Sequence, residues 1–138
     1  LLYMKKIILL SMIAVMSSCG TTRYYSENTY ITDFTQYVNE GFCIYPQNEV
    51  PPTLKYTPLA KILIEFNSGK PSEEDKNTPG LFVIKDGNPH TFTDYVIASK
   101  EYQIQRLVEE AKKHKANAII GMKMGAGTIY GLAVKLDK

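Results

Sequence analysis

Residues 99–136 read SKEYQIQRLVEEAKKHKANAIIGMKMGAGTIYGLAVKL. In the first half, apolar side chains recur at helical spacing from Tyr102 to Ala111, while charged side chains fill the opposite side. This pattern predicts an amphipathic helix over about residues 99–115. In the second half, two apolar runs flank the glycine-containing turn 125–127, which predicts a β-hairpin with strands at 118–124 and 128–136.

Alternation along the predicted hairpin divides its side chains between two faces. A single helix covers only one face of a sheet, so the second face must meet either a second copy of the chain or residues 30–58. Small residues on one face are expected to let a neighbouring backbone approach closely. The apolar face is expected to carry Ile120, Met122, Met124, Tyr130, Leu132, Val134 and Leu136, and the small residues are Gly121, Gly131 and Ala133.

The earlier half of the chain supplies the other expected strands. Ala60, Ile62, Ile64 and Phe66 alternate with polar residues, which is typical of a half-buried strand. The predicted fold class is therefore α+β, a small and mainly antiparallel sheet packed against one principal helix. In chain order, we expect a short helix at 35–40, a strand at 42–46, a proline-rich loop at 46–58, a strand at 59–66, a polar solvent loop at 67–80, a strand at 81–85, and either strand or helix at 91–99.

The N-terminal residues have the order of a secretory signal peptide. Met4-Lys5-Lys6 precedes an apolar run from Ile7 to Met16, and the small residues Ser17-Ser18 come before Cys19. The apolar run is about half of the roughly 20 residues that a membrane-spanning helix needs. Leu1-Leu2-Tyr3 precede the expected initiator Met4. A cleaved signal peptide over residues 1–18 is therefore predicted, not a permanent transmembrane anchor.

Met16-Ser17-Ser18-Cys19 resembles a bacterial lipobox, although such boxes prefer Leu where Met16 stands. The resemblance implies that Cys19 becomes the first mature residue and carries lipid, including palmitate. The alternative is an ordinary signal peptide with a coincidental cysteine. We expect residues 19–29 to form a lipidated tether, residues 30–138 to form one folded domain, and the protein to be held on a bacterial envelope membrane, the outer membrane first.

Charge and cysteine content exclude some classes of protein. The chain has 16 basic and 14 acidic residues, and removal of residues 1–18 takes away Lys5 and Lys6, leaving 14 of each. A nucleic-acid partner is not expected, because such partners require a basic surface, and the dense cluster Lys112, Lys113 and Lys115 lies at a helix end. With Cys19 acylated, Cys43 is the one remaining thiol, so no intramolecular disulfide is available.

The stretch 107–122, followed by Tyr130-Gly131-Leu132-Ala133-Val134-Lys135, resembles the YbjQ-like family, whose domains carry a heavy-metal-binding label. The family motif is Gly-Ala-(Asn/Asp)-Ala-(Ile/Val)-(Ile/Val)-Gly, and Lys115 here replaces its first glycine. The hairpin of the family ends in Gly-Thr-Ala-Val, and Leu132 replaces the threonine. The resemblance covers about residues 104–136. It implies a helix against a curved, mainly antiparallel sheet and a ring-forming homo-oligomer, and it extends to stress-sensing outer-membrane lipoproteins of related fold.

The residues do not themselves predict a metal or catalytic site. Cys43, His90 and His114 lack the close spacing of zinc ligands, although a Cys-His pair is an alternative for nucleophilic catalysis. Glu73-Glu74-Asp75 lacks the alternation of a calcium loop, and the turn at 125–127 lacks the Lys-Ser/Thr of a phosphate loop. We therefore expect no cofactor and no catalytic residue.

The expected function is that of a membrane-anchored, non-catalytic interaction or structural module of the cell envelope. Its partners would be the membrane, through the N-terminal lipid, further copies of itself and an envelope protein. The alternative is a small-ligand or metal-binding protein.

Overall fold

The structure is a computed structural model that describes residues 20, 23–85 and 94–137. The chain divides into two compact units, Leu1–Ile31 and Thr32–Lys138. The predicted signal peptide, Cys19 and His90 lie outside the described residues. Residues 23–31 form neither helix nor strand, and Tyr24 and Tyr25 are exposed. None of the helices in the described part of the chain is long and apolar enough to span a membrane.

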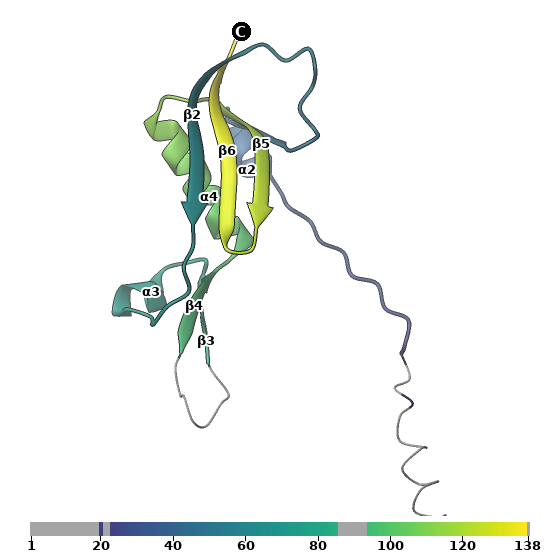
Figure 1. The fold of residues 1–138 in the computed structure, drawn as a ribbon, viewed down its shortest axis with the longest axis vertical. Coiled ribbons are helices and arrows are strands. Elements are labelled where there is room, and N and C mark those ends of the chain that lie inside the picture. The colour runs from purple at the N-terminus through teal and green to yellow at the C-terminus, as the bar shows by residue number, and fades with distance from the viewer. Residues whose placement is uncertain (1–19, 21–22, 86–93, 138) are drawn as a thin grey trace, which may run out of the picture. The chain divides into compact units, whose positions relative to one another are not determined.

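The second unit is built from short strands and helices that follow the predicted order closely (Figure 1). For residues 91–99 the sequence allowed either a strand or a helix, and the structure has strand β4 within this range. The elements are α2 (Thr35–Asn39), β1 (Cys43–Pro46), β2 (Tyr56–Glu65), α3 (Glu73–Asn77), β3 (Leu81–Ile84), β4 (Tyr95–Ala98), α4 (Lys100–Lys113), β5 (Ala118–Gly125) and β6 (Thr128–Leu136).

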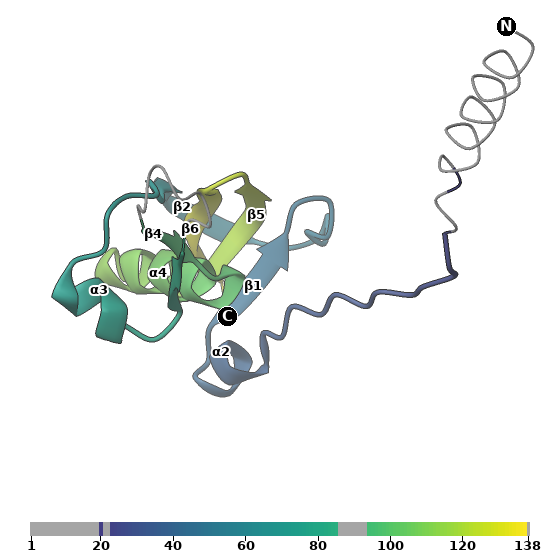
Figure 2. The same cartoon turned by 90° about the horizontal axis from the view of Figure 1, so that it is seen from below.

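Four strands form the principal sheet in the order β1-β5-β6-β2. The β2–β6 and β5–β6 pairs are antiparallel, whereas β1 and β5 are parallel. Helix α4 packs on one face of this sheet, as the two views in Figures 1 and 2 show. β3 and β4 form a separate antiparallel pair. The predicted α+β class, with one principal helix and a C-terminal hairpin, is confirmed.

Helix α4 has a defined start and end. The Ser99 hydroxyl accepts a hydrogen bond from the Tyr102 N–H at 3.1 Å, which satisfies one free donor of the first turn. At the other end, the Ala116 N–H bonds the Ala111 carbonyl and the Lys115 N–H bonds the Lys112 carbonyl. This Schellman pattern places Lys115 in the left-handed region, with φ of 61°. Lys115, which stands where the YbjQ-like motif has its first glycine, thus occupies the left-handed position of the turn, where glycine is favoured.

A bulge in β5 corrects the predicted faces of the hairpin. Gly121 has φ of 65°, and the β5–β6 register shifts between Ile120 and Lys123. As a result Ile120 packs on the face away from α4, while Met122 and Met124 pack with the helix. The prediction that these three residues share one face is wrong for Ile120. The predicted face of the second strand is confirmed for Leu132, Val134 and Leu136.

The expected role of the small residues is also corrected. A Cβ at Gly131 would lie 2.5 Å from the Ile119 Cγ2 and 3.2 Å from the Leu107 Cδ2, and Ala133 is fully buried in the same cluster. These two positions therefore admit helix α4 of the same chain, not the backbone of a neighbour. A Cβ at Gly121 would meet no atom within 4 Å.

Two buried clusters hold the sheet, one on each face. The larger lies under α4 and α2, and Leu107, Ile119 and Ile129 are fully buried in it. The smaller, around Ala118, Ile120 and Val134, is covered by Val50 and Leu54 from the loop after β1. All of these residues lie between 34 and 136. A fragment that starts at Gly20 therefore contains all the described residues of both clusters.

Two upstream boundaries differ from the prediction. β2 begins at Tyr56, inside the expected proline-rich loop, and its register shifts between Pro58 and Ala60, which accommodates Pro58 in an edge strand. The expected loop 67–80 contains α3. The Ser72 hydroxyl accepts from the Asp75 N–H, and the Asp75 carboxylate accepts from the Ser72 N–H at 2.8 Å. These two hydrogen bonds stabilise the first turn of α3, which has no buried residue to hold it in place.

Candidate functional site

Of the residues considered for metal binding or catalysis, the structure describes Cys43 and His114, which come from different elements. Cys43 is half-buried at the start of β1 against the smaller core cluster, and His114 is the exposed C-cap of α4. Over residues 23–85 and 94–137, no three His, Cys, Asp or Glu side chains lie close enough to share a metal ion. His90 lies outside these ranges.

The acidic run at 73–75 forms the first turn of α3. Ser72 hydrogen bonds lower the pKa of the Asp75 carboxyl, through the backbone N–H first and then the side chain. Glu73 pairs with Lys76 at 2.6 Å. Negative side chains at a helix N-terminus complement its dipole. These residues thus have a local structural role at the start of α3.

The outer edge of β2 is the first surface with properties of a binding site. β2 is an edge strand of the principal sheet, and two of its apolar side chains face solvent: Leu59 is 42% exposed and Leu63 is 60% exposed. Lys61 and Glu65, on the same face, are exposed too. A long edge strand with exposed leucines is a template for pairing with another strand.

Backbone hydrogen bonding defines which groups of β2 are available. The Phe66 N–H donates to the Gly127 carbonyl at 2.7 Å, toward the β5–β6 turn. In an antiparallel strand the N–H and C=O of one residue point to the same side, and this side alternates from residue to residue. Since the Phe66 N–H points toward β6, the N–H and C=O groups of Lys61, Leu63 and Glu65 point away from β6. Among the described residues, none of these three makes a backbone hydrogen bond outside its own strand pairing.

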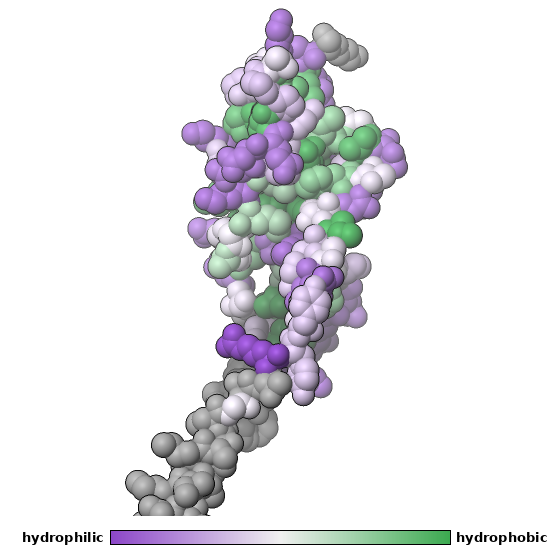
Figure 3. Space-filling model, turned by 90° about the vertical axis from the view of Figure 1, so that its right-hand side faces the viewer, coloured by the Kyte–Doolittle hydropathy of each residue, from purple (hydrophilic) through white to green (hydrophobic). Residues whose placement is uncertain are grey.

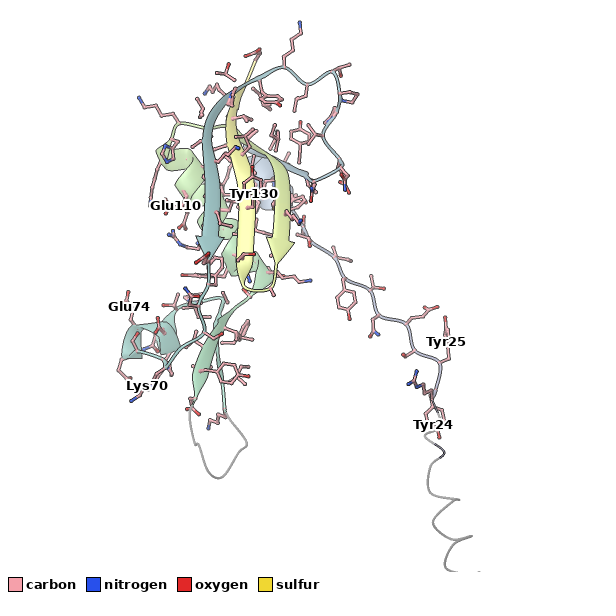
Figure 4. The ribbon with its side chains drawn as sticks, viewed as in Figure 1. Tyr24, Tyr25, Lys70, Glu74, Glu110 and Tyr130 are labelled. Carbon is pink, nitrogen blue, oxygen red and sulfur yellow. The ribbon has the colours of Figure 1, made fainter. Side chains whose placement is uncertain are left out.

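The outer sheet face next to this edge is covered only in part. Val50 and Leu54 pack over the β1 and β5 side, whereas Tyr130 and Leu132 on β6 are half-buried. Figure 4 shows Tyr130 on the face of β6 turned away from α4. Figure 3, viewed from the side of β5 and opposite β2, shows hydrophobic patches among hydrophilic side chains on the surface. Residues from 30–58 therefore cover part of this face, which is the intrachain alternative that the sequence allowed. The part of the face next to β2 is left uncovered by them.

A second candidate is a groove of about 470 Å³ between the end of β2, β4 and the start of α4. The Phe66 and Tyr102 rings meet edge to face there, with centroids 6.2 Å apart. The buried Gln103 carboxamide donates to the Ala98 carbonyl at 3.2 Å, and its Oε1 accepts no hydrogen bond from the residues that the structure describes. The groove is lined by Glu65, Phe66, Asn67, Ser68, Gly69, Lys70, Asp75, Leu81, Val96, Ile97, Ala98, Tyr102, Gln103 and Gly127.

Sequence reasoning missed this groove. Gln103 lies next to Ile104 on the helical stripe that faces the core, and a polar residue at such a position is the signal that was available. The other walls come from several separate segments between Glu65 and Gly127, which no local pattern brings together.

The charged side chains of α4 form ion pairs with one another. Arg106 pairs with Glu109 and, at 2.9 Å, with Glu110, which also pairs with Lys113 at 2.6 Å. A hydrogen bond from Gln105, followed by that from Arg106, lowers the pKa of the Glu109 carboxyl. The Lys113 hydrogen bond does the same for Glu110. The paired side chains of Arg106, Glu109 and Glu110 are partly buried, and their charges compensate one another along the helix.

Comparison with known proteins finds relatives of the C-terminal part of the chain. Residues 78–136 match the model of the YbjQ_1 family, which is described as "Putative heavy-metal-binding". The chain is 31% identical over 61 residues to a UPF0145 protein of Fervidobacterium nodosum, covering 38% of this chain and 56% of that protein. It is 33% identical over 61 residues to a UPF0145 protein of Pseudothermotoga lettingae, covering 38% and 58%.

The chain therefore spans little more than half the length of these curated relatives. No solved structure matches the chain. Helix α4 and the β5–β6 hairpin, which carry the sequence motif, both lie inside the matched segment. The predicted resemblance to the YbjQ-like family is thus confirmed over residues 78–136.

Proposed function

We propose that this chain is a lipid-anchored, non-catalytic protein of the cell envelope whose folded unit acts as an interaction module and assembles with a second copy through the outer edge of β2. The observation that carries the proposal is the open backbone edge at Lys61, Leu63 and Glu65, with the Leu63 side chain 60% exposed beside it. The lipobox at Cys19 supports the anchor.

The residues of β2 fit an antiparallel pairing of two copies about a two-fold axis at Leu63. In this register Leu63 lies opposite the Leu63 of a second copy, and Lys61 lies opposite its Glu65. All three residues have outward-pointing backbone groups, so each pair would exchange two hydrogen bonds. Opposite charges across a strand pair are favourable, and the two leucines shield each other from water. The contact is isologous and closes at a dimer.

The anchor and the edge act together in this proposal. A single strand pair buries less than the total of about 1,600 Å² of a standard interface, so association in solution would be weak. Tethering by lipid confines copies to one surface and raises their effective concentration. Residues 20–31 are too few to hold the domain far from that surface. The membrane would thus convert a weak pairing into a populated assembly.

The test is sedimentation equilibrium of residues 20–138 over a wide concentration range. We expect a monomer–dimer equilibrium in the wild type and a monomer for Leu63→Lys. Val38→Lys is the matched control, since Val38 is 58% exposed on α2, away from β2, and it should associate like the wild type. A wild type that stays monomeric at all concentrations, or equal dissociation by both variants, would contradict the proposal.

A further inference from the structure

One face of the β3–β4 ribbon is apolar although it is exposed to solvent. Four apolar side chains share this face as two directly opposite pairs, Phe82 with Ile97 and Ile84 with Tyr95. Phe82 is 54% exposed, Tyr95 40% and Ile97 39%. The side chains of the other face are each half-buried, namely Leu81, Val83, Val96 and Ala98. The solvent face of an antiparallel pair is normally polar, so this apolar ribbon face has the character of a contact surface.

The size of the apolar ribbon face decides which kind of partner fits it. At their measured exposures Phe82, Tyr95 and Ile97 offer roughly 200–300 Å² of surface. A stable interface between proteins covers about 800 Å² on each partner, which is several times more. A bilayer requires no matching shape, and binding to it grows with the apolar area that enters its interfacial layer. Tyr95 suits that layer, because a tyrosine keeps its ring in apolar surroundings and its hydroxyl in water.

The start of the folded unit lies at the same end of α4 as the ribbon. Thr32 lines a small cavity together with Glu101, which is in the first turn of α4. β4 ends two residues before α4 begins. Residues 20–31 extend to at most about 40 Å. A lipid at Cys19 would therefore keep this end of the folded unit within reach of the membrane surface.

We propose that the apolar ribbon face enters the interfacial layer of a phospholipid bilayer and forms a second membrane contact beside the N-terminal lipid. This inference rests on the lipid anchor of the proposed function and does not require the pairing of β2. The tether raises the effective concentration of the surface, so a patch too small to hold a free protein still holds a tethered one. Lys85 follows β3 and Asp94 precedes β4, one charge of each sign, so the contact depends on apolar burial and not on anionic headgroups.

A single tryptophan reports the contact, because the chain contains none. Residues 20–138 with Phe82→Trp are attached by an N-terminal histidine tag to phosphatidylcholine vesicles that contain a nickel-chelating lipid. Part of the phosphatidylcholine carries bromine near the start of its acyl chains, at the depth of about 5–10 Å that interfacial side chains reach. We expect the emission of Phe82→Trp to shift to shorter wavelength and to be quenched by the brominated lipid. Tyr95→Trp, on the same face, should behave alike.

Leu59→Trp is the matched control, since Leu59 is 42% exposed and Tyr95 40%. Leu59 lies near the start of β2, and the ribbon lies beyond the end of that strand, about 20 Å further along (Figure 1). The emission of Leu59→Trp should therefore not be quenched. Ile97→Asp added to Phe82→Trp should remove most of the quenching, while circular dichroism shows that the fold is kept.

The outcomes separate this inference from the rest of the proposed function. Leu63→Lys added to Phe82→Trp should leave the quenching unchanged, and the chelating lipid makes the result independent of acylation at Cys19. The proposal is overturned if neither Phe82→Trp nor Tyr95→Trp is quenched, or if Leu59→Trp is quenched equally. An unquenched shift to shorter wavelength that grows with the surface density of the protein would also overturn it, since that result assigns the face to a second copy.

Discussion

The Asn117 Oδ1 accepts a hydrogen bond from the Leu136 N–H at 2.7 Å, which joins the start of β5 to the end of β6. The backbone of Asn117 adds two further bonds, its N–H to the Val134 carbonyl and its carbonyl from the Cys43 N–H, each 3.1 Å. Asn117, which lies between α4 and β5, thus links β1, β5 and β6. This arrangement gives a structural reason for Asn or Asp at that position of the family motif.

Asn117→Ala should lower the free energy of unfolding by about 1–2 kcal/mol, because the Leu136 N–H loses its acceptor. Asn117→Asp keeps a side-chain oxygen and should lose less. Urea unfolding followed by circular dichroism measures both. An alanine variant as stable as the wild type would show that water replaces the side chain at no cost.

Lys115→Gly should raise the free energy of unfolding by about 1 kcal/mol, because Lys115 holds a left-handed conformation that costs a residue with a Cβ. Lys112→Gly, inside the last turn of α4, is the control and should lower stability by up to about 1 kcal/mol. If both glycines destabilise alike in thermal and urea unfolding, the turn does not have the Schellman geometry described.

The capping box of α3 should make that helix sensitive to acid. Hydrogen bonds from Ser72 hold the pKa of the folded Asp75 carboxyl below its unfolded value. The associated stabilisation is therefore present above the unfolded pKa and is lost as the pH falls through the folded pKa. In NMR titrations, Asp75 should titrate below the usual range for aspartate, and the Ser72 amide should shift with it. A normal Asp75 pKa, or identical spectra for Ser72→Ala in this region, would refute the cap.

Cys19 should be the acylated residue. Cells grown with labelled palmitate should incorporate it into the wild-type protein, and Cys19→Ala should abolish incorporation. Cys43→Ala is the matched control, since Cys43 lies in β1 against the smaller core cluster, and it should leave labelling unchanged. Labelling that persists in Cys19→Ala would refute the lipobox interpretation.

Periodicity predicted the elements that are long and regular. The apolar stripe from Tyr102 to Ala111 and the alternation around residues 125–127 gave α4 and the β5–β6 hairpin within two residues. Both signals depend on local side-chain spacing, which the sequence contains directly.

Features that depend on one backbone angle or on distant contacts were not predictable in this way. The left-handed Gly121 reverses the alternation of β5, so Ile120 and Met122 point to opposite faces. Gly131 was expected to admit another chain, but the choice between a neighbour and α4 depends on which face the helix covers. The groove at Gln103 requires segments that meet only in three dimensions.

The most direct test of the proposed assembly exchanges the charges of Lys61 and Glu65 on β2. Sedimentation equilibrium would measure dimerisation of the wild type, the two single variants and the double variant of residues 20–138. In the register centred on Leu63, Lys61→Glu alone and Glu65→Lys alone each place like charges opposite one another twice, and each should weaken dimerisation about tenfold. The double variant restores both opposite-charge pairs and should return to wild-type affinity. Single variants without effect, or a double variant at least as weak as the singles, would contradict the proposed pairing of β2 with a second copy.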